Sequence, residues 1–209
     1  MACEPLHVQL DLSNYDVDVV NTTGESAGSV TVTADVSSLD NKSLLHQQTQ
    51  ANLAADSVAS FPLNVAPLLA NGLVLVKLEM KSASGDVLSR NLYWLGEKSE
   101  DYRALDKLPP AQIMASAHFA KQESGEPRIV VELKNAGVAA ALENKLTLVN
   151  GKDGSRILPA YYSDNYVSLL PGESREITID YPATEGVQPQ LEVRGWNLAS
   201  RKVGFGSSN

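Results

Sequence analysis

The sequence contains few residues of the kinds that build disulfides, metal centres and nucleophilic active sites. It has one cysteine, Cys3, and three histidines in 209 residues. A single cysteine forms no disulfide within the chain, so packing must stabilise the fold, and cysteine usage does not identify the redox compartment. Because no Cys-x-x-Cys pair or His-Glu-x-x-His run is present, we predict no bound metal and no cofactor.

Long apolar runs and clustered basic residues are also missing. No apolar run approaches the roughly 20 residues that cross a bilayer, and no targeting signal precedes the first strand-like segment. Lysine and arginine are scattered singly in a chain of net charge −8, which repels phosphate backbones. We therefore expect no membrane and no nucleic acid as a partner, and the 43% hydrophobic and 20% charged content is typical of a soluble globular protein.

Candidates for catalysis are equally scarce. A serine nucleophile would need a positioned base, but only His7, His46 and His118 are present, and no Gly-x-Ser-x-Gly elbow occurs. The acidic, amide-rich loop Ser163-Asp164-Asn165 is the one candidate for calcium, and turn capping by Asp164 and Asn165 is the alternative. The sequence thus predicts no active site of its own.

Short runs of alternating or apolar residues, separated by Asn, Asp, Gly and Ser, fill the first half of the chain. They predict seven strands, at residues 7–12, 16–21, 29–36, 44–50, 58–65, 73–81 and 87–95. Alternation is clearest from Ser29 to Val36, whose even-numbered residues form an apolar face. Asp40-Asn41 and Ser84-Gly85-Asp86 favour tight hairpin turns. Seven short strands at this spacing indicate an immunoglobulin-like sandwich.

A charged stretch follows Leu95 and closes at Pro109-Pro110, where proline cannot donate to a sheet ladder. We predict a first domain at residues 1–96, a linker at 97–111 and a second domain at 112–209. Eight further strands are predicted at 113–120, 128–135, 145–150, 156–162, 167–170, 176–181, 190–196 and 201–205. Residues 138–143 are the one stretch whose alanines favour helix. The predicted fold class is all-β, with two tandem immunoglobulin-like β-sandwich domains.

A weak internal repeat supports two similar domains. Residues 16–24 are echoed by residues 129–137, and each copy is a strand that ends in asparagine before a glycine-containing turn. The asparagines are Asn21 and Asn135. The repeat therefore predicts one shared local structure in both halves.

Aromatic residues are the remaining candidates for function, because sugar-binding sandwiches present them to pyranose rings. Trp94 and Trp196 each end a late strand, and we predict structural packing for both, in a core or at a domain contact. Three tyrosines lie beside a loop, where contact with a ligand or a partner surface is more common. The candidate residues for contact with carbohydrate or another domain are Tyr161, Tyr162, Asp164, Asn165 and Tyr166.

Several segments together carry a family resemblance. They are Cys3-Glu4-Pro5-Leu6-His7-Val8-Gln9, Ser89-Arg90-Asn91-Leu92-Tyr93-Trp94-Leu95, Ser163-Asp164-Asn165-Tyr166, Leu170-Pro171-Gly172-Glu173-Ser174 and Arg194-Gly195-Trp196-Asn197. In this order, over nearly the whole chain, they resemble the C-terminal part of glycoside hydrolase family 2 enzymes of the exo-β-glucosaminidase and β-mannosidase type. The first segment is similar to the exit from the catalytic barrel into two immunoglobulin-like domains, so we expect the chain to begin inside a longer protein.

This resemblance implies a parent glycosidase with a retaining mechanism. One carboxylic acid protonates the leaving oxygen, and a second carboxylate about 5 Å away attacks the anomeric carbon. Both would belong to a barrel of about 250 residues with alternating strands and helices, which this chain lacks. No catalytic residue is therefore transferred onto the chain, and we expect it not to be an enzyme by itself.

The resemblance also implies partners and a setting. The catalytic barrel of the same polypeptide is the implied partner, oligosaccharide is a further candidate, and the parent would be a secreted or periplasmic bacterial enzyme. Two alternatives stay open: an independent carbohydrate-binding module, and an adhesive or spacer pair of sandwiches. The choice between mannosides and glucosaminides belongs to barrel residues outside this sequence.

Overall fold

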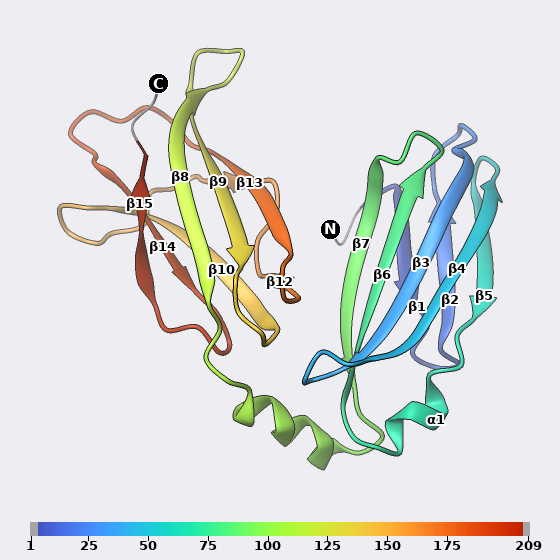
Figure 1. The fold of residues 1–209 in the computed structure, drawn as a ribbon. Helices are drawn as coiled ribbons and strands as arrows, with labels where there is room; N and C mark the ends of the chain where they lie inside the picture. Colours follow the sequence, from blue (N-terminus) through green and yellow to red (C-terminus); the bar gives the residue numbers. More distant parts are fainter. Residues whose placement is uncertain (1–3, 207–209) are drawn as a thin grey trace. The chain divides into compact units, whose positions relative to one another are not determined.

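A computed structural model of the chain describes residues 4–206 and divides between Lys107 and Leu108 into two compact units. Each unit consists of β-strands around its own apolar core (Figure 1). In the described residues the helical elements are the short α1 (Ala66–Leu69) and the 3-10 helix η1 (Ser99–Lys107). Neither is long and apolar enough to cross a bilayer. The all-β fold class predicted from the sequence is confirmed.

Two sheets face each other in the first unit, and in Figure 1 the smaller one lies behind the larger. The smaller sheet has the order β1-β2-β5, with β1 at Leu6–Leu10, β2 at Asp16–Asn21 and β5 at Ser57–Pro62. The larger has the order β4-β3-β6-β7, with β3 at Gly28–Ser38, β4 at Ser43–Leu53, β6 at Val74–Ser82 and β7 at Val87–Leu95. All pairs are antiparallel.

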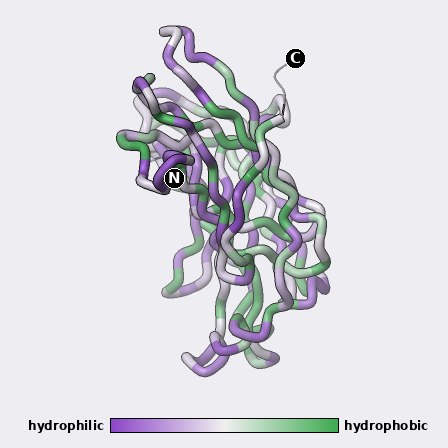
Figure 2. Tube along the Cα trace, turned by 90° about the vertical axis from the view of Figure 1, so that its left-hand side faces the viewer, coloured by the Kyte–Doolittle hydropathy of each residue, from purple (hydrophilic) through white to green (hydrophobic). Residues whose placement is uncertain are grey.

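Alternating hydropathy along the strands determines which side chains form the core of the first unit. Figure 2 shows hydrophobic and hydrophilic residues mixed along each strand rather than gathered in separate segments. On β3 the predicted apolar face is confirmed, since Val30, Val32, Ala34 and Val36 are at most 3% exposed. Asn41 has a φ of 62°, the left-handed backbone that its predicted turn requires.

Side chains of β7 hydrogen-bond the backbone of β1, which is an edge strand of the opposite sheet. The Oγ of Ser89 accepts a hydrogen bond from the N–H of Val8 at 3.3 Å, and the Nδ2 of Asn91 donates to the carbonyl of Val8 at 2.6 Å. The Oη of Tyr93 accepts from the N–H of Leu10 at 3.1 Å. Because an edge strand leaves backbone groups unpaired, these side chains take the place of a neighbouring strand. The segment from Ser89 to Leu95 therefore has a structural role.

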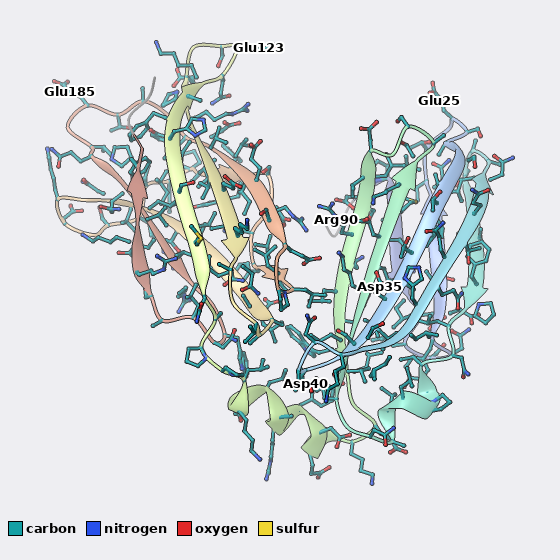
Figure 3. All side chains as sticks on the ribbon, viewed as in Figure 1. Glu25, Asp35, Asp40, Arg90, Glu123 and Glu185 are labelled. Carbon is teal, nitrogen blue, oxygen red and sulfur yellow. The ribbon has the colours of Figure 1, made fainter. Side chains whose placement is uncertain are left out.

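Glu79 is the most strongly paired carboxylate on the outer face of the larger sheet. Its carboxylate lies 2.8 Å from the Lys81 ammonium and 2.7 Å from the Arg90 guanidinium, and Arg90 is labelled on β7 in Figure 3. Burial opposes ionisation of Glu79, but these two cations outweigh burial and lower its pKa from 4.5 to about 2. The ionised form of Glu79 is thus bound more tightly in the folded protein.

We expect Glu79→Gln to destabilise the first unit at pH 7 but not at pH 2. The folded-state pKa is depressed, so the stabilisation is present above pH 4.5 and is lost as the pH falls towards 2. Solvent screens these partly exposed pairs, so the loss at pH 7 should be about 1 kcal/mol. Urea unfolding at pH 7 and at pH 2 measures it, with Glu25→Gln at an exposed position as the control. Equal pH profiles for wild type and Glu79→Gln would refute the prediction.

Eight strands build the second unit in one continuous order, β11-β13-β9-β8-β15-β14-β10-β12. Their bounds are β8 Ile113–Lys121, β9 Pro127–Asn135, β10 Ala141–Asn150, β11 Tyr161–Tyr162, β12 Val167–Leu169, β13 Ser174–Asp180, β14 Pro189–Arg194 and β15 Arg201–Phe205. Parallel pairing of β15 with β8 joins the two halves of this order. Both halves contribute to one core, in which Ile129, Leu146 and Ile177 are at most 1% exposed.

The two asparagines of the internal repeat have the same hydrogen bonds, which confirms the repeat. Each is at most 1% exposed, and its Oδ1 accepts from the backbone N–H two residues further on. Each Nδ2 donates to the carbonyl four residues further on and to a carbonyl of a distant segment. The acceptors are Glu25 and Ala54 for Asn21, and Ala139 and Leu169 for Asn135. A side-chain amide therefore fastens one loop in each unit.

The helix tendency assigned to residues 138–143 is wrong. Strand β10 begins at Ala141, and Ala141 and Leu142 are at most 1% exposed. Burial in the sheet overrides the small intrinsic preference of alanine for helix.

Several predicted strands end earlier than expected. The strands predicted at 7–12 and 190–196 end two residues early, at Leu10 and Arg194, and two others differ more. The strand at 58–65 ends at Pro62, and α1 follows with a proline in its first turn, where the missing N–H costs nothing. Of the strand at 156–162 only β11 remains, with an isolated bridge between Arg156 and Val149. Pro159 interrupts the ladder because it has no N–H.

The predicted linker, residues 97–111, contains regular structure. It contains η1, in which Leu105 is 5% exposed, and the Oη of Tyr102 accepts from the N–H of Gly96 at 3.3 Å. Residues 97–107 belong to the first unit and residues 108–111 to the second.

Candidate functional site

The tyrosine loop, residues 161–166, is the candidate site predicted from the sequence. It joins β11, which pairs with β13, to β12, which pairs with β10. Since β11 and β12 stand at opposite ends of the strand order, the loop connects the two edges of the second unit. Its conformation therefore depends on both edges.

Tyr162 anchors this loop inside the unit. Its ring packs against the core, and its Oη accepts a hydrogen bond from the N–H of Leu148 at 2.9 Å. Burial raises the pKa of Tyr162. The phenol hydroxyl is therefore engaged with the backbone of β10.

Asn165 and Asp164 hold the loop from two further sides. The Oδ1 of Asn165 accepts from the N–H of Leu146 at 2.8 Å, and its Nδ2 donates to the carbonyl of Leu146 at 3.1 Å, as a paired strand would. Asp164 forms an ion pair with Arg175 at 2.9 Å, with side chains 14% and 19% exposed, and its other oxygen accepts from the N–H of Asn165. Turn capping is thus favoured over calcium binding, and residues 4–206 contain no group of three or more His, Cys, Asp or Glu placed to hold a metal.

Tyr161 and Tyr166 face solvent instead. Their side chains are 69% and 51% exposed. Tyr166 has a φ of 58°, in the left-handed region, and the Lys145 ammonium lies 4.9 Å from its ring centroid. A hydrogen bond from Lys145 lowers the pKa of Tyr166, with Arg194 and Arg156 adding weaker attraction for the phenolate. These two tyrosines are the accessible part of the loop.

The two tryptophans differ in exposure. Trp94 is partly buried on the outer face of β7, opposite Leu75, which is 1% exposed. Trp196 follows β14 and is 55% exposed. Its backbone N–H donates to the carbonyl of Leu142 at 2.9 Å. A packing role for Trp196 stays a prediction.

Asn197 gives the segment after β14 a structural role. Its Nδ2 donates to the carbonyls of Pro109 at 2.8 Å and Ala140 at 2.9 Å, and its Oδ1 accepts from the N–H of Leu142 at 3.2 Å. The turn from Gly195 to Asn197 therefore ties the start of the second unit to β10.

Sequence reasoning missed one aromatic pair. The rings of Phe119 on β8 and Phe205 on β15 stack with centroids 4.5 Å apart and planes 3° apart, and Phe119 is 43% exposed. Only the parallel pairing of β15 with β8 brings them together, and nothing in the sequence signals that pairing.

A small cavity lies between the sheets of the first unit. Its volume is about 10 Å³, and it is lined by Val17, Val32, Ala34, Gln47, Thr49 and Phe61. That space suits one water molecule at most, so it cannot take a sugar ring.

A match to a known family covers most of the second unit and the end of the first. The family model described as the exo-β-D-glucosaminidase Ig-fold domain matches residues 91–198, more than half of the chain. The chain belongs to this family. The matched region runs from β7 to the turn at Asn197 and includes the tyrosine loop.

The relatives that match this chain are much longer proteins. The chain is 28% identical to an exo-β-D-glucosaminidase of Amycolatopsis orientalis over 97% of this chain and 22% of the relative. It is also 28% identical to a mannosylglycoprotein endo-β-mannosidase of Lilium longiflorum over 95% of this chain and 27% of the relative. It thus spans about a quarter of the length of these relatives.

Structural comparison agrees with the sequence match. The crystal structure of the Amycolatopsis orientalis exo-chitosanase CsxA superimposes with a TM-score of 0.87 at 27% identity, covering 96% of this chain and 26% of that one. The resemblance to immunoglobulin-like domains of glycoside hydrolase family 2 is therefore confirmed. Cys3, at the start of the first resembling segment, lies outside the described residues.

Proposed function

We propose that this Ig-fold chain is a non-catalytic accessory region of a retaining glycoside hydrolase of the β-mannosidase or exo-β-glucosaminidase type. The observation that carries the proposal is the coverage: the chain matches glycosidases over nearly its whole length but only about a quarter of theirs. The described residues form two strand-built units, whereas a catalytic barrel would need about 250 residues of alternating strands and helices. The reacting carboxylates are expected in the remainder of the parent protein.

The proposed role is to support the catalytic barrel and to contribute to the rim of its substrate cleft. Tyr162, Asp164 and Asn165 use their polar groups within the second unit, so they would hold the tyrosine loop in place. Tyr161 and Tyr166 remain accessible and would make the contact. A loop held by buried anchors presents its exposed aromatics with little loss of conformational entropy on binding.

Hydrolysis assays test the accessory role. We expect this chain to turn over neither a chromogenic β-mannoside nor a chromogenic β-glucosaminide, and the full-length gene product to turn over one of them. The preferred substrate would identify the enzyme type. Turnover by the 209-residue chain alone would contradict the proposal.

Tyrosine variants test the loop contact. In the full-length protein we expect the double variant Tyr161→Ala, Tyr166→Ala either to raise KM about tenfold or to weaken the contact between the second unit and the catalytic barrel by a similar factor. Truncation of a buried interface tyrosine has an effect of this size. Steady-state kinetics and thermal unfolding measure the two effects. Tyr162→Phe is the control, since it removes only the internal hydrogen bond and should cost about 1 kcal/mol of folding stability. Unchanged KM and unchanged Tm in the double variant would rule out the contact.

A carbohydrate-binding module is the second candidate, favoured by the exposed side chains of Tyr161 and Trp196. It predicts that the chain binds chitosan or mannan oligosaccharides by itself. Titration calorimetry with no heat of binding at millimolar sugar would eliminate it.

A further inference from the structure

Three basic side chains gather around Tyr166 on one face of the second unit. Lys145 on β10 lies directly opposite Arg194 on β14 in the antiparallel register. The Lys145 ammonium lies 4.9 Å from the centre of the Tyr166 ring. Arg156 bridges to Val149, which is four residues after Lys145 and therefore on the same side of β10. We call Lys145, Arg156, Arg194 and Tyr166 the cationic surface.

This arrangement is unfavourable in the unit by itself. Like charges directly opposite each other on neighbouring strands destabilise a sheet. The ion pairs formed within residues 4–206 do not include Lys145, Arg156 or Arg194. Yet the chain carries a net charge of −8, so carboxylates are plentiful elsewhere.

Carboxylates on the same face do not neutralise the surface. Glu192 lies two residues from Arg194 on the same side of β14, opposite Thr147 on one neighbouring strand and Lys202 on the other. Glu143 precedes the regular pairing of β10 with β14, so no residue of β14 lies opposite it in that register, and burial raises its pKa. The positive charges therefore dominate at Tyr166, where they favour the ionised phenol.

We propose that the cationic surface docks onto a carboxylate-bearing protein surface, supplied by the same polypeptide outside the two Ig-fold units. The inference rests on the proposed accessory function and names the chemistry of its partner. Arginine and tyrosine are among the residues that carry most of the binding energy at protein interfaces. A guanidinium group also pairs with a carboxylate through two parallel hydrogen bonds. This chain covers only 22% of one such relative, so most of that protein lies beyond the matched region, where the partner surface would be found.

A sugar fits the cationic surface less well than carboxylates do. A glucosaminide carries an ammonium group near neutral pH and would be repelled by Lys145, Arg156 and Arg194. The ammonium of Lys145 already lies near the Tyr166 ring, where it competes with stacking on a pyranose. An anionic saccharide is the competing ligand, and the experiment below separates it from a protein partner.

Lysine labelling and carbodiimide cross-linking of the full-length protein test the proposal. A carbodiimide joins an amine to a carboxylate only when the two are in contact. We expect a cross-link between Lys145 and an Asp or Glu outside the 209 residues of this chain. We also expect Lys145 to be acetylated about tenfold more slowly than Lys134, because labelling then requires the interface to open. Lys134 is the matched control, an exposed lysine on strand β9 of the same unit.

Salt and a variant sharpen the test. High salt should raise the acetylation rate of Lys145 towards that of Lys134, because salt screens ion pairs at an interface. Arg194→Gln should do the same at low salt, whereas an equivalent change at the exposed Lys202 should not.

Four outcomes would overturn the proposal. Lys145 could label as fast as Lys134 with no cross-link, or its cross-links could reach only carboxylates of this chain. Protection could also depend on an added glucuronate oligosaccharide, which would make the surface a site for anionic sugars. None of these results bears on the accessory function, because the hydrolysis assays test that function separately. Protection of Lys145 without any carboxylate cross-link would refute the named chemistry while leaving the accessory role intact.

Discussion

Asn135→Ala is expected to destabilise the second unit by about 3 kcal/mol, one of the two largest effects of a single substitution that we anticipate. Asn135 is 0% exposed, and its Nδ2 donates to the carbonyls of Ala139 at 2.8 Å and Leu169 at 2.9 Å. Its Oδ1 accepts from the N–H of Gly137 at 3.0 Å. Alanine leaves all three backbone groups without their partner in a buried position, where an unsatisfied group costs about 1 to 3 kcal/mol.

Tryptophan fluorescence measures this effect one unit at a time. The chain has two tryptophans, with Trp94 in the first unit and Trp196 in the second. In a Trp94→Phe background, urea unfolding reports the second unit through Trp196. Glu132→Ala, at an exposed position on β9 of the same unit, is the control and should change stability by less than about 0.5 kcal/mol. A loss below 0.5 kcal/mol for Asn135→Ala would show that water or loop movement replaces the amide.

The internal repeat gives the same prediction for the first unit. Asn21 donates to the carbonyls of Glu25 and Ala54 and accepts from Thr23, so Asn21→Ala should destabilise the unit that Trp94 reports by a similar amount. The sequence contained the signal, since both asparagines end a strand before a turn. The sequence did not indicate which distant carbonyl accepts from each asparagine, because only the fold brings Ala54 close to Asn21 and Leu169 close to Asn135.

Hydropathy alternation predicted most strands because burial of one sheet face follows directly from it. Ser29 to Val36 is the clearest case, and β3 extends beyond it at both ends. Alternation failed where local chemistry and packing disagreed. Residues 138–143 have alanines that favour helix, but β10 needs Ala141 as a buried strand residue. Pro159 ended a predicted strand whose apolar residues looked continuous.

The sequence predicted the tyrosine loop as a candidate site but did not distinguish its exposed residues from its buried ones. Tyr161 and Tyr162 are adjacent and identical in type, yet Tyr161 is exposed and the ring of Tyr162 packs against the core. That difference arises from the strand period of two and from the N–H of Leu148, which only the fold places beside the Oη of Tyr162. Likewise, the pairing of Lys145 with Arg194 depends on the register of β10 and β14. Long-range register is the information that residue patterns lack.

Gly195→Ala is expected to destabilise the second unit by about 2 to 3 kcal/mol, the upper part of the usual cost of overpacking a tight site. A Cβ at this position would lie 2.7 Å from the Oδ1 of Asn144 and 2.9 Å from the carbonyl oxygen of Leu142. Asn144 cannot turn away, because it is 0% exposed and its Nδ2 donates to the carbonyls of Ala141 and Val167, both at 2.9 Å.

The second neighbour of Gly195 is equally fixed. The carbonyl of Leu142 accepts from the N–H of Trp196 at 2.9 Å, so moving it breaks the bond that holds the turn. Gly204→Ala is the matched control, because a Cβ on that strand residue meets nothing within 4 Å. Urea unfolding followed through Trp196 should separate the two variants by about 2 kcal/mol. Equal stabilities would mean that the turn can shift at Gly195, and that its tight packing against Asn144 does not hold the segment in place.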